Sequence, residues 1–387
     1  MESPDWTGLY LGVYGGGGGI VDNIELPGAG PGNANGLGGE GVLGGVMAGY
    51  NYQMNNIVLG LQGELGYNDL KSELNFGGFS ASARQGFVAA LSARAGLLVT
   101  PDTLAYIIGG YSHSDYKAGA SGLGSVHEKY HGFHVGGGLE TMLTPNITLR
   151  AEYRYTSYSG EDWGTGGFLN IEPSSHTGTM GLAYNFGGGH GTPAAAADYA
   201  QSDGDWNGLY AGFYGGGGAI VDELKTPLAG GATFNGVGGE GALGGVMAGY
   251  NHQINNIVLG LQGEVGYNDL ATELNIPAGP SVKARQGLVA ALSARAGMLV
   301  TPDTLAYIIG GYSHSDYKFT SNFIGSHKET YNGFHVGGGL ETKIGSNVTL
   351  RAEYRYTGYG SEDWGTGGVI KVSPSSHTGT VGLAWQF

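Results

Sequence analysis

The sequence lacks cysteine altogether among its 387 residues, which excludes a disulfide framework and a thiolate metal site. Proline is scarce, with 12 residues against 80 glycines, and the glycines have no three-residue period, so a collagen is excluded. Charged residues make up 13% of the chain and aromatics 11%. A disordered chain would have a high charge density and few aromatics, so disorder is excluded. No run of 18 apolar residues occurs, so we expect no transmembrane helix.

Glycine and tyrosine are present in excess. Glycine at this density is costly in helices, which argues against an α-rich fold, and the Ala-, Glu- and Leu-rich heptads of a coiled coil are missing. The composition, with 25 Tyr, therefore predicts an all-β protein. The formal net charge of −15, with only 17 Lys and Arg, argues against a nucleic-acid partner, which would need a basic face.

The chain contains one segment twice. Residues 36–70 and 236–270 differ at five of 35 positions, and residues 84–117 and 285–318 differ at two of 34. Each copy closes on a terminal phenylalanine, and a Gly- and Ala-rich stretch between the copies has the composition of a linker. We therefore expect copy 1 at residues 1–186, a periplasmic linker at 187–204 and copy 2 at 205–387.

Alternating apolar and polar residues, bounded by turn residues, predict eight strands in each copy. Three connections are tight and four are long and polar or glycine-rich, and the two kinds alternate along the chain. Antiparallel strands in this order place every long loop at one end, as in a transmembrane β-barrel with short periplasmic turns and long extracellular loops. In copy 1 the predicted strands are 6–19, 40–53, 57–70, 84–99, 103–116, 129–143, 147–160 and 174–186, and the long loops are about 20–39, 71–83, 117–128 and 161–173.

Side-chain alternation gives each predicted strand one apolar face. In strand 84–99, Phe87 and Leu91 lie on one face, and Ser92 and Arg94 lie on the other. A soluble sandwich would turn the apolar face inward and leave the charges in water. A barrel in lipid inverts this arrangement and turns the charges toward its lumen.

Several of these charges lie about five to seven residues above the tight turns, roughly 12–16 Å deep, which is the middle of a membrane. On the lipid face they would be costly, so we expect them to face the lumen and to pair. Glu140 and Arg150 should be cross-strand neighbours. The predicted lumen charge network comprises Glu64, Arg94, Glu140, Arg150, Glu152 and Arg154 in copy 1, and Glu264, Arg295, Glu341, Arg351, Glu353 and Arg355 in copy 2.

Aromatic residues cluster near both ends of the predicted strands. Two aromatic girdles are typical of outer-membrane barrels, because amphipathic rings favour the level of the lipid headgroups. The expected girdle at the turn end comprises Trp6, Tyr52, Tyr106, Tyr184 and Phe186, and the one at the loop end comprises Tyr14, Tyr67, Tyr116 and Tyr158.

Four motifs carry a resemblance to a known family: Trp6-Thr-Gly-Leu-Tyr10, Gly44-Gly-Val-Met-Ala-Gly-Tyr50, Gly60-Leu-Gln-Gly-Glu64 and Leu149-Arg-Ala-Glu152. Together they resemble the porin-family outer-membrane immunogenic proteins, which are OmpA-like eight-stranded barrels of Gram-negative bacteria. Phe387 resembles the C-terminal aromatic that the barrel-assembly machinery reads as a membrane-insertion signal. The resemblance covers about 185 residues of each copy, whereas members of that family usually carry one barrel per chain.

The resemblance implies a location in the outer membrane of a Gram-negative bacterium. The expected partners are outer-membrane lipid and lipopolysaccharide, and the barrel-assembly machinery during biogenesis, while self-association stays open. The residues from Met1 to Trp6 do not form a signal peptide. Either the protein is cytosolic, or the numbering starts at a mature chain whose signal was removed and replaced by Met.

Two architectures are compatible with the duplication. Two tandem eight-stranded barrels would each be filled by their own side chains, and one 16-stranded barrel would enclose an aqueous pore. The 18-residue linker is longer than a normal turn and favours separate barrels. The first architecture predicts a structural and surface role for the outward loops, and the second predicts a porin for passive diffusion of small solutes and ions.

A Ser112-His113-Ser114-Asp115 segment recurs in copy 2, and His134 on the next strand is expected nearly opposite His113. A Ser/His/Asp group near the outer rim would suit a lipid-modifying hydrolase or acyltransferase. A polar layer of the lumen is the favoured interpretation, and no third ligand for a metal is evident. We therefore expect no enzymatic activity, no cofactor and no metal.

Overall fold

The computed structural model describes strands and tight turns throughout both copies. It contains no helix long and apolar enough to cross a membrane in the part of the chain that it describes. That part comprises residues 5–25, 33–76, 79–121, 124–163, 169–187, 204–226, 232–275, 281–322, 325–364 and 370–387.

Twenty strands account for nearly all of the described residues. In copy 1 they are β1 (Gly8–Glu25), β2 (Asn33–Met54), β3 (Ile57–Asn68), β4 (Lys71–Phe76), β5 (Phe79–Thr100), β6 (Thr103–Ala120), β7 (Gly124–Thr144), β8 (Ile147–Tyr158), β9 (Glu161–Trp163) and β10 (Leu169–Asn185). In copy 2 they are β11 (Gly208–Thr226), β12 (Ala232–Ile254), β13 (Ile257–Asn268), β14 (Ala271–Asn275), β15 (Ser281–Thr301), β16 (Thr304–Ser321), β17 (Gly325–Lys343), β18 (Val348–Tyr359), β19 (Glu362–Trp364) and β20 (Ile370–Gln386).

Each copy closes into its own eight-stranded antiparallel barrel. β1 pairs with β2 on one edge and with β10 on the other, and β11 pairs in the same way with β12 and β20. β3 and β4 form one interrupted strand, as do β8 and β9. The ten strand segments of a copy therefore form the eight strands of its barrel. The expectation of two eight-stranded barrels is confirmed. The alternative of one 16-stranded barrel is wrong, because both edges of β1 are used within copy 1.

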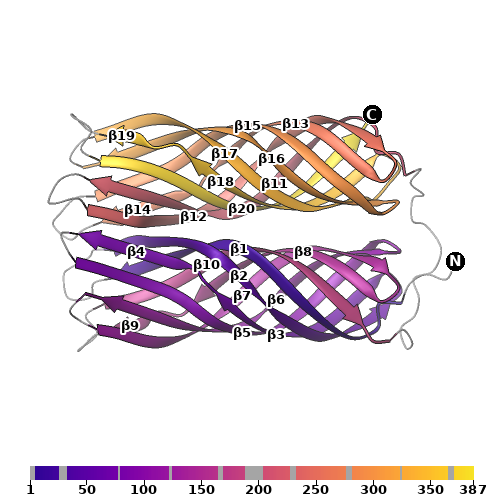
Figure 1. The fold of residues 1–387 in the computed structure, drawn as a ribbon, viewed down its shortest axis with the longest axis horizontal. Coiled ribbons are helices and arrows are strands. Elements are labelled where there is room, and N and C mark those ends of the chain that lie inside the picture. The colour runs from indigo at the N-terminus through magenta and orange to yellow at the C-terminus, as the bar shows by residue number, and fades with distance from the viewer. Residues whose placement is uncertain are drawn as a thin grey trace.

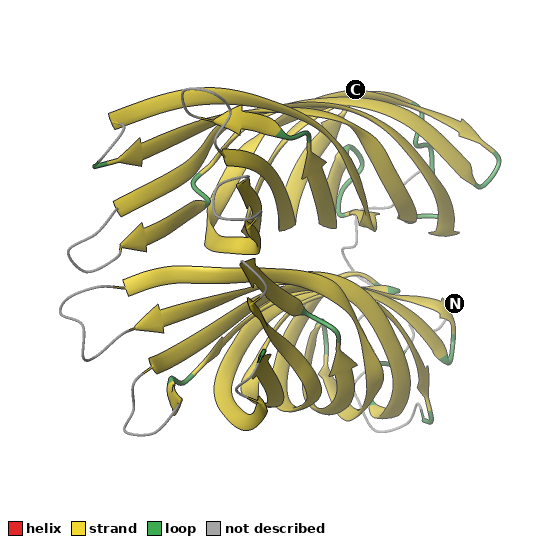
Figure 2. Ribbon diagram, turned by 60° about the vertical axis from the view of Figure 1, so that its left-hand side comes forward, coloured by secondary structure: helices red, strands yellow, loops and turns green. Residues whose placement is uncertain are grey.

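The two barrels lie side by side (Figures 1 and 2). The tight turns of both barrels gather at one end, and in copy 1 one of them places Asn55 at a φ of 57°, a conformation that asparagine tolerates better than most residues. The linker expected at 187–204 lies mostly outside the described residues.

The strands are longer at the loop end than predicted. The expected loop at 20–39 is largely strand, since β1 continues to Glu25 and β2 begins at Asn33. Beyond the apolar part of the wall, a continued ladder satisfies the backbone N–H and C=O groups. The strand ends also cross between the barrels: β4 pairs with β12, and β14 pairs with β2.

The apolar face of the wall points outward. Leu61, Leu91 and Ile107 are 64%, 65% and 70% exposed, whereas Arg94, on the opposite face of β5 from Leu91, is 3% exposed. The alternation predicted for strand 84–99 is therefore observed. Charges inside and hydrocarbon side chains outside are the arrangement that a lipid environment requires.

The two aromatic girdles are only partly as predicted. Tyr52, Tyr67, Tyr184 and Phe186 point outward and are exposed. The remaining five residues are not part of an outward girdle, because their positions, in a strand or, for Trp6, just before β1, have the parity of the inward face. Four of these, Trp6, Tyr106, Tyr116 and Tyr158, are buried, and Tyr14 lines the lumen beside Glu64 and Arg154.

Candidate functional sites in the lumens and between the barrels

The first lumen contains a carboxylate held by two arginines. Glu140 forms ion pairs with Arg94 and, at 3.3 Å, with Arg150, which is its direct neighbour in the β7–β8 register. The hydroxyl of Thr148 donates to the other oxygen of Glu140 at 2.7 Å. All of these side chains are buried, so each charge depends on the others for the interactions that water would otherwise provide.

A second group lies beside the first. The guanidinium of Arg154 donates to Glu64 at 2.6 and 2.8 Å and to Glu152 at 2.6 Å, and the hydroxyl of Tyr106 donates to Glu152 at 2.8 Å. Gln62 joins the two groups, because its amide oxygen accepts from Arg150 at 2.7 Å and its amide nitrogen donates to Glu64. The lumen thus holds three carboxylates and three guanidinium groups in one connected network.

The second barrel repeats this network. Arg295 and Arg351 contact Glu341, and Arg355 contacts Glu264 at 2.5 Å and Glu353 at 2.6 Å. The structure therefore places all twelve of the charges that the sequence assigned to the lumens inside the two barrels.

Apolar plugs close each lumen above and below the charges. Near the tight turns of copy 1, the cluster comprises Trp6, Val58, Leu98, Leu104, Tyr106, Ile108 and Met142. Near the loops it comprises Ile20, Leu70, Tyr116, Tyr130 and Tyr158. Copy 2 has equivalent clusters built on Trp206 and on Tyr317. Between the plugs, the cavities found beside the described charges measure only about 50 Å³ in copy 1 and 40 Å³ in copy 2.

The Ser/His/Asp group that would suit a hydrolase or acyltransferase does not form. His113 and Asp115 do share a face, with Nε2 of the histidine 3.3 Å from Oδ1 of the aspartate, but the partner of His113 across the ladder is His131. His134 pairs with Gly110 and points into the lumen, where its ring nitrogens lie 2.8 Å from Ser92 and Ser112. The prediction that His134 lies opposite His113 is wrong, since the register places the two residues on opposite faces of the wall.

The contact between the barrels has two reciprocal polar clasps near the loop end. The carboxylate of Glu240 lies 3.0 Å from the imidazole of His176 and accepts from Ser174 at 2.8 Å. Glu40 meets His377 at 3.1 Å and Ser375 at 2.8 Å in the same way. Each barrel therefore contributes one carboxylate that contacts a serine and a histidine of the other.

The barrels also meet closer to the tight turns. The hydroxyls of Thr103 and Thr304 lie 3.0 Å apart. Between these threonines and the clasps, Tyr354 packs directly on Gly178, where an added Cβ would come within 2.1 Å of the ring, and Tyr153 packs on Gly379 in the same way. Apolar contact at this level is made by Leu139, Ala151, Leu340 and Ala352. Both glycines are therefore required by the close approach of the two walls.

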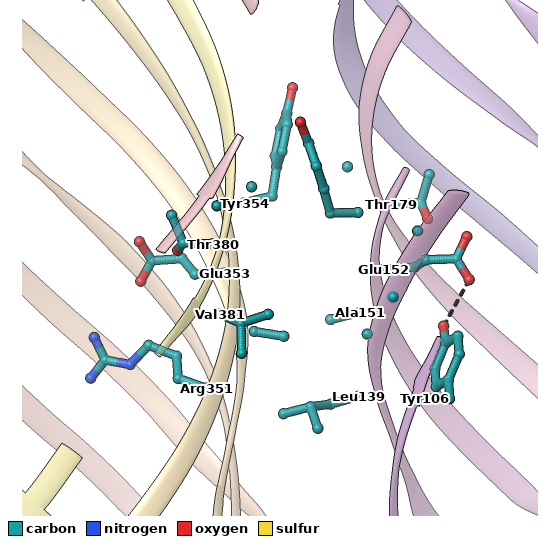
Figure 3. A pocket seen from close by; sticks show the side chains of 18 of the residues that line it. Tyr106, Leu139, Ala151, Glu152, Thr179, Arg351, Glu353, Tyr354, Thr380 and Val381 are labelled. Carbon is teal, nitrogen blue, oxygen red and sulfur yellow. Dashed lines mark hydrogen bonds between the residues drawn. The ribbon is translucent and has the colours of Figure 1, made fainter. Parts of the chain in front are cut away.

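A cavity of about 1010 Å³ lies between the barrels (Figure 3). Its lining is mostly apolar and comes from both copies, with Leu139, Ala151 and Val381 turned toward it. Arg351 and Glu353 line it with their backbone and point away (Figure 3). Because water would find few polar partners there, a cavity of this kind at membrane depth suits hydrocarbon rather than a polar solute.

These inter-barrel residues were not predicted from the sequence. A signal for them is present, because Glu40 and His176 have the same parity as the outward apolar residues of β2 and β10. An ionisable residue on a lipid-facing position is costly unless another protein surface covers it.

Removing one charge from a lumen should destabilise its barrel strongly. We expect Glu140→Gln to lower the free energy of unfolding by about 3–5 kcal/mol, because Arg94 and Arg150 would be left buried with an uncompensated charge. Urea unfolding of the full chain in detergent micelles measures the change. Glu73→Gln, at a partly exposed residue outside the lumen, is the control and should shift the free energy by less than about 0.5 kcal/mol. Equal effects of the two substitutions would contradict the pairing described above.

A disulfide should form between the barrels when cysteines replace Thr103 and Thr304, because their side-chain oxygens lie 3.0 Å apart and the chain has no other cysteine. A protease site placed between residues 187 and 204 allows the copies to be separated on a gel. After cleavage, the oxidised Thr103→Cys/Thr304→Cys chain should run as one species without reductant and as two with it. A Thr103→Cys/Leu292→Cys chain should separate under both conditions, and separation of the first variant without reductant would refute the contact.

Known proteins are similar to each of the two copies separately. A family model described as "Outer membrane protein beta-barrel domain" matches residues 2–186 and again residues 191–387. The "25 kDa outer-membrane immunogenic protein" of Brucella melitensis is 32% identical over 182 residues, which are 47% of this chain and 79% of the relative. The "22 kDa outer membrane protein" of Rhizobium leguminosarum is 32% identical over 162 residues, covering 41% of this chain and 67% of the relative.

Among solved structures, the chain is similar to Ail, the attachment invasion locus protein of Yersinia pestis. The TM-score is 0.24 at 15% identity, and the match covers 46% of this chain and 99% of that one. Neisserial surface protein A matches with a TM-score of 0.27 at 19% identity and covers 45% and 97%.

Proposed function

Because the chain belongs to the family of outer-membrane β-barrel proteins of Gram-negative bacteria, we propose that it is a non-conducting structural and surface protein. Two sealed barrels would anchor its loops at the outer surface, where they contact the envelope or other surfaces. The observation that carries this proposal is the filling of each lumen by three ion-paired carboxylates between two apolar plugs. An eight-stranded wall leaves little more room than its own side chains occupy.

The alternative, a porin for passive diffusion, finds less support. It depended on a single 16-stranded wall, and each copy instead closes on itself. A hydrolase or acyltransferase role is also disfavoured, because His134 and the pair His113 and Asp115 lie on opposite faces of the wall.

The proposal also includes the domain boundaries and one residue with a role in biogenesis. We propose the domain boundaries 1–186 and 205–387 with a periplasmic linker at 187–204, which fits the position of β10 and β11 on either side of it. We also propose Phe387 as the membrane-insertion signal, since it directly follows β20 and is 78% exposed.

Conductance of the refolded full chain in a planar bilayer tests the structural role against the porin role. We expect silence, or steps on the order of a few tens of picosiemens, because the plugs and the ion-paired network occupy the described part of each lumen. Steps on the order of nanosiemens would overturn the proposal. As a control, the Tyr116→Ala/Tyr130→Ala/Tyr158→Ala variant, which lacks the aromatic plug at the loop end, should conduct more often than the unmodified chain.

A further inference from the structure

Two histidines lie side by side on the outward face of copy 1. His113 on β6 is the register partner of His131 on β7, and the Nδ1 atoms of the two rings lie 3.4 Å apart. The ring centroids are 4.8 Å apart, and the ring planes are inclined by 43° to each other. The register thus brings His131, and not His134, to His113. Neither ring takes part in the lumen network, because both lie on the outer side of the wall.

The neighbours of the pair leave the two facing nitrogens available as ligands. The carboxylate Oδ1 of Asp115 lies 3.3 Å from Nε2 of His113. Because a carboxylate only accepts, it favours a hydrogen on Nε2, and the lone pair of the neutral ring is then on Nδ1. The hydroxyl of Tyr111 contacts Nδ1 of His131 and can donate its hydrogen there. With the hydrogens placed in this way, two nitrogen lone pairs face each other, and a cation between them would be stabilised by both.

The distance between the two nitrogens fits a tetrahedral metal ion. Zn²⁺ binds imidazole nitrogen at about 2.0–2.1 Å, so two such ligands at a tetrahedral angle are about 3.3–3.4 Å apart. A ligating histidine commonly donates its other ring N–H to a carboxylate, and Asp115 occupies that position. Within the described part of the chain, no group of three or more carboxylates and imidazoles is arranged to hold a metal ion. The protein would therefore supply two nitrogens, and water would complete the coordination.

The pair lies at a level that a hydrated cation can reach. On the side of the tight turns, the next outward residues of the two strands are Tyr111 and Phe133, which are 43% and 73% exposed. Exposed aromatic residues of this kind mark the level of the lipid headgroups. On the side of the loops, the next outward residues are Asp115 and Lys129, which are register partners. Since His131 is itself exposed, the two rings are accessible from the outer surface.

Copy 2 keeps the first histidine of the pair and replaces the second. His314 occupies the position of His113, and its register partner is Asn332. Nδ1 of His314 lies 2.8 Å from the amide oxygen of Asn332, which accepts, so this nitrogen carries the hydrogen. Asp316 lies 3.9 Å from Nε2 of the same ring. The second copy therefore offers a single imidazole whose facing nitrogen already has a partner.

From this geometry we propose that His113 and His131 bind one divalent cation of the Zn²⁺, Cu²⁺ and Ni²⁺ class on the outer surface of copy 1, with Asp115 as a positioning residue. Imidazole suits these metals, whereas Mg²⁺ and Ca²⁺ prefer oxygen ligands. The bound ion would join β6 to β7, and the equivalent position in copy 2 would bind none. The proposal does not depend on the structural role proposed above, so either can fail without the other.

Isothermal titration calorimetry of the full chain in detergent with ZnCl₂ tests this proposal. Because the chain has 11 histidines, the readout is the difference between variants. His131→Asn gives copy 1 the pair that copy 2 has, and this variant should bind one Zn²⁺ fewer per chain than the unmodified protein. Asn332→His should bind one Zn²⁺ more. Asp115→Asn should keep the stoichiometry and weaken the affinity for Zn²⁺ about 10–100-fold, as expected for a carboxylate that orients a ligating histidine.

Both exchanges between histidine and asparagine introduce a residue that the other copy already carries at that position, so the barrels should fold, and circular dichroism checks this. Zn²⁺ should raise the urea midpoint of the unmodified chain more than that of His131→Asn, because an ion that binds only the folded barrel stabilises it. Equal Zn²⁺ stoichiometry of these two proteins, or no gain in Asn332→His, would overturn the site. Unchanged affinity in Asp115→Asn would overturn the positioning role of the carboxylate.

Discussion

The pairing of buried charges inside each ring of eight strands is the constraint on which the rest of the structure depends. The outward face of the wall is apolar, so ionised side chains at mid-membrane have only the lumen to occupy. In that narrow space Glu140 needs both Arg94 and Arg150, and Arg154 needs both Glu64 and Glu152. The network fills the middle of the barrel and leaves only small cavities, and the plugs close the ends. A lumen organised for pairing is poorly suited to transport, which directs attention to the outer surfaces.

The same constraint explains the contact between the barrels. Glu40 and His176 have the parity of lipid-facing residues, so an isolated barrel would present ionisable groups outside its wall near the loop end. When the two copies pack together, these groups pair with each other in two reciprocal clasps, Glu40 with His377 and Glu240 with His176. The glycines beneath Tyr153 and Tyr354 let the walls approach closely enough for the clasps to form. The features that would be unfavourable in one barrel are thus complementary in two.

Much of the fold follows from the sequence. Period-two alternation and the alternation of tight and long connections predict the strands, their order and the inward position of residues such as Arg94. The aromatic residues are harder, because a tyrosine near a strand end suits a girdle or a plug equally well. Alternation along the strand, and not nearness to its end, distinguishes Tyr67, which faces lipid, from Tyr116, which fills the lumen. The mistaken placement of His134 has another origin, since the relative shift of β6 and β7 is fixed by the whole ladder and not by local residues.

Contacts between the copies cannot be predicted from local sequence patterns, because they depend on the closure of two barrels and on how the barrels pack. The loop-end pairing shows why both copies belong in one chain. β4 pairs with β12 while β14 pairs with β2, so each barrel contributes a strand end to the other. Such an exchange between separate chains would need both to meet in the membrane in the correct orientation. A covalent connection raises the effective concentration of the second copy and makes the pairing intramolecular. The near-identity of the two strand sets then has a physical reason, since each copy must be both the donor and the acceptor of the same contacts.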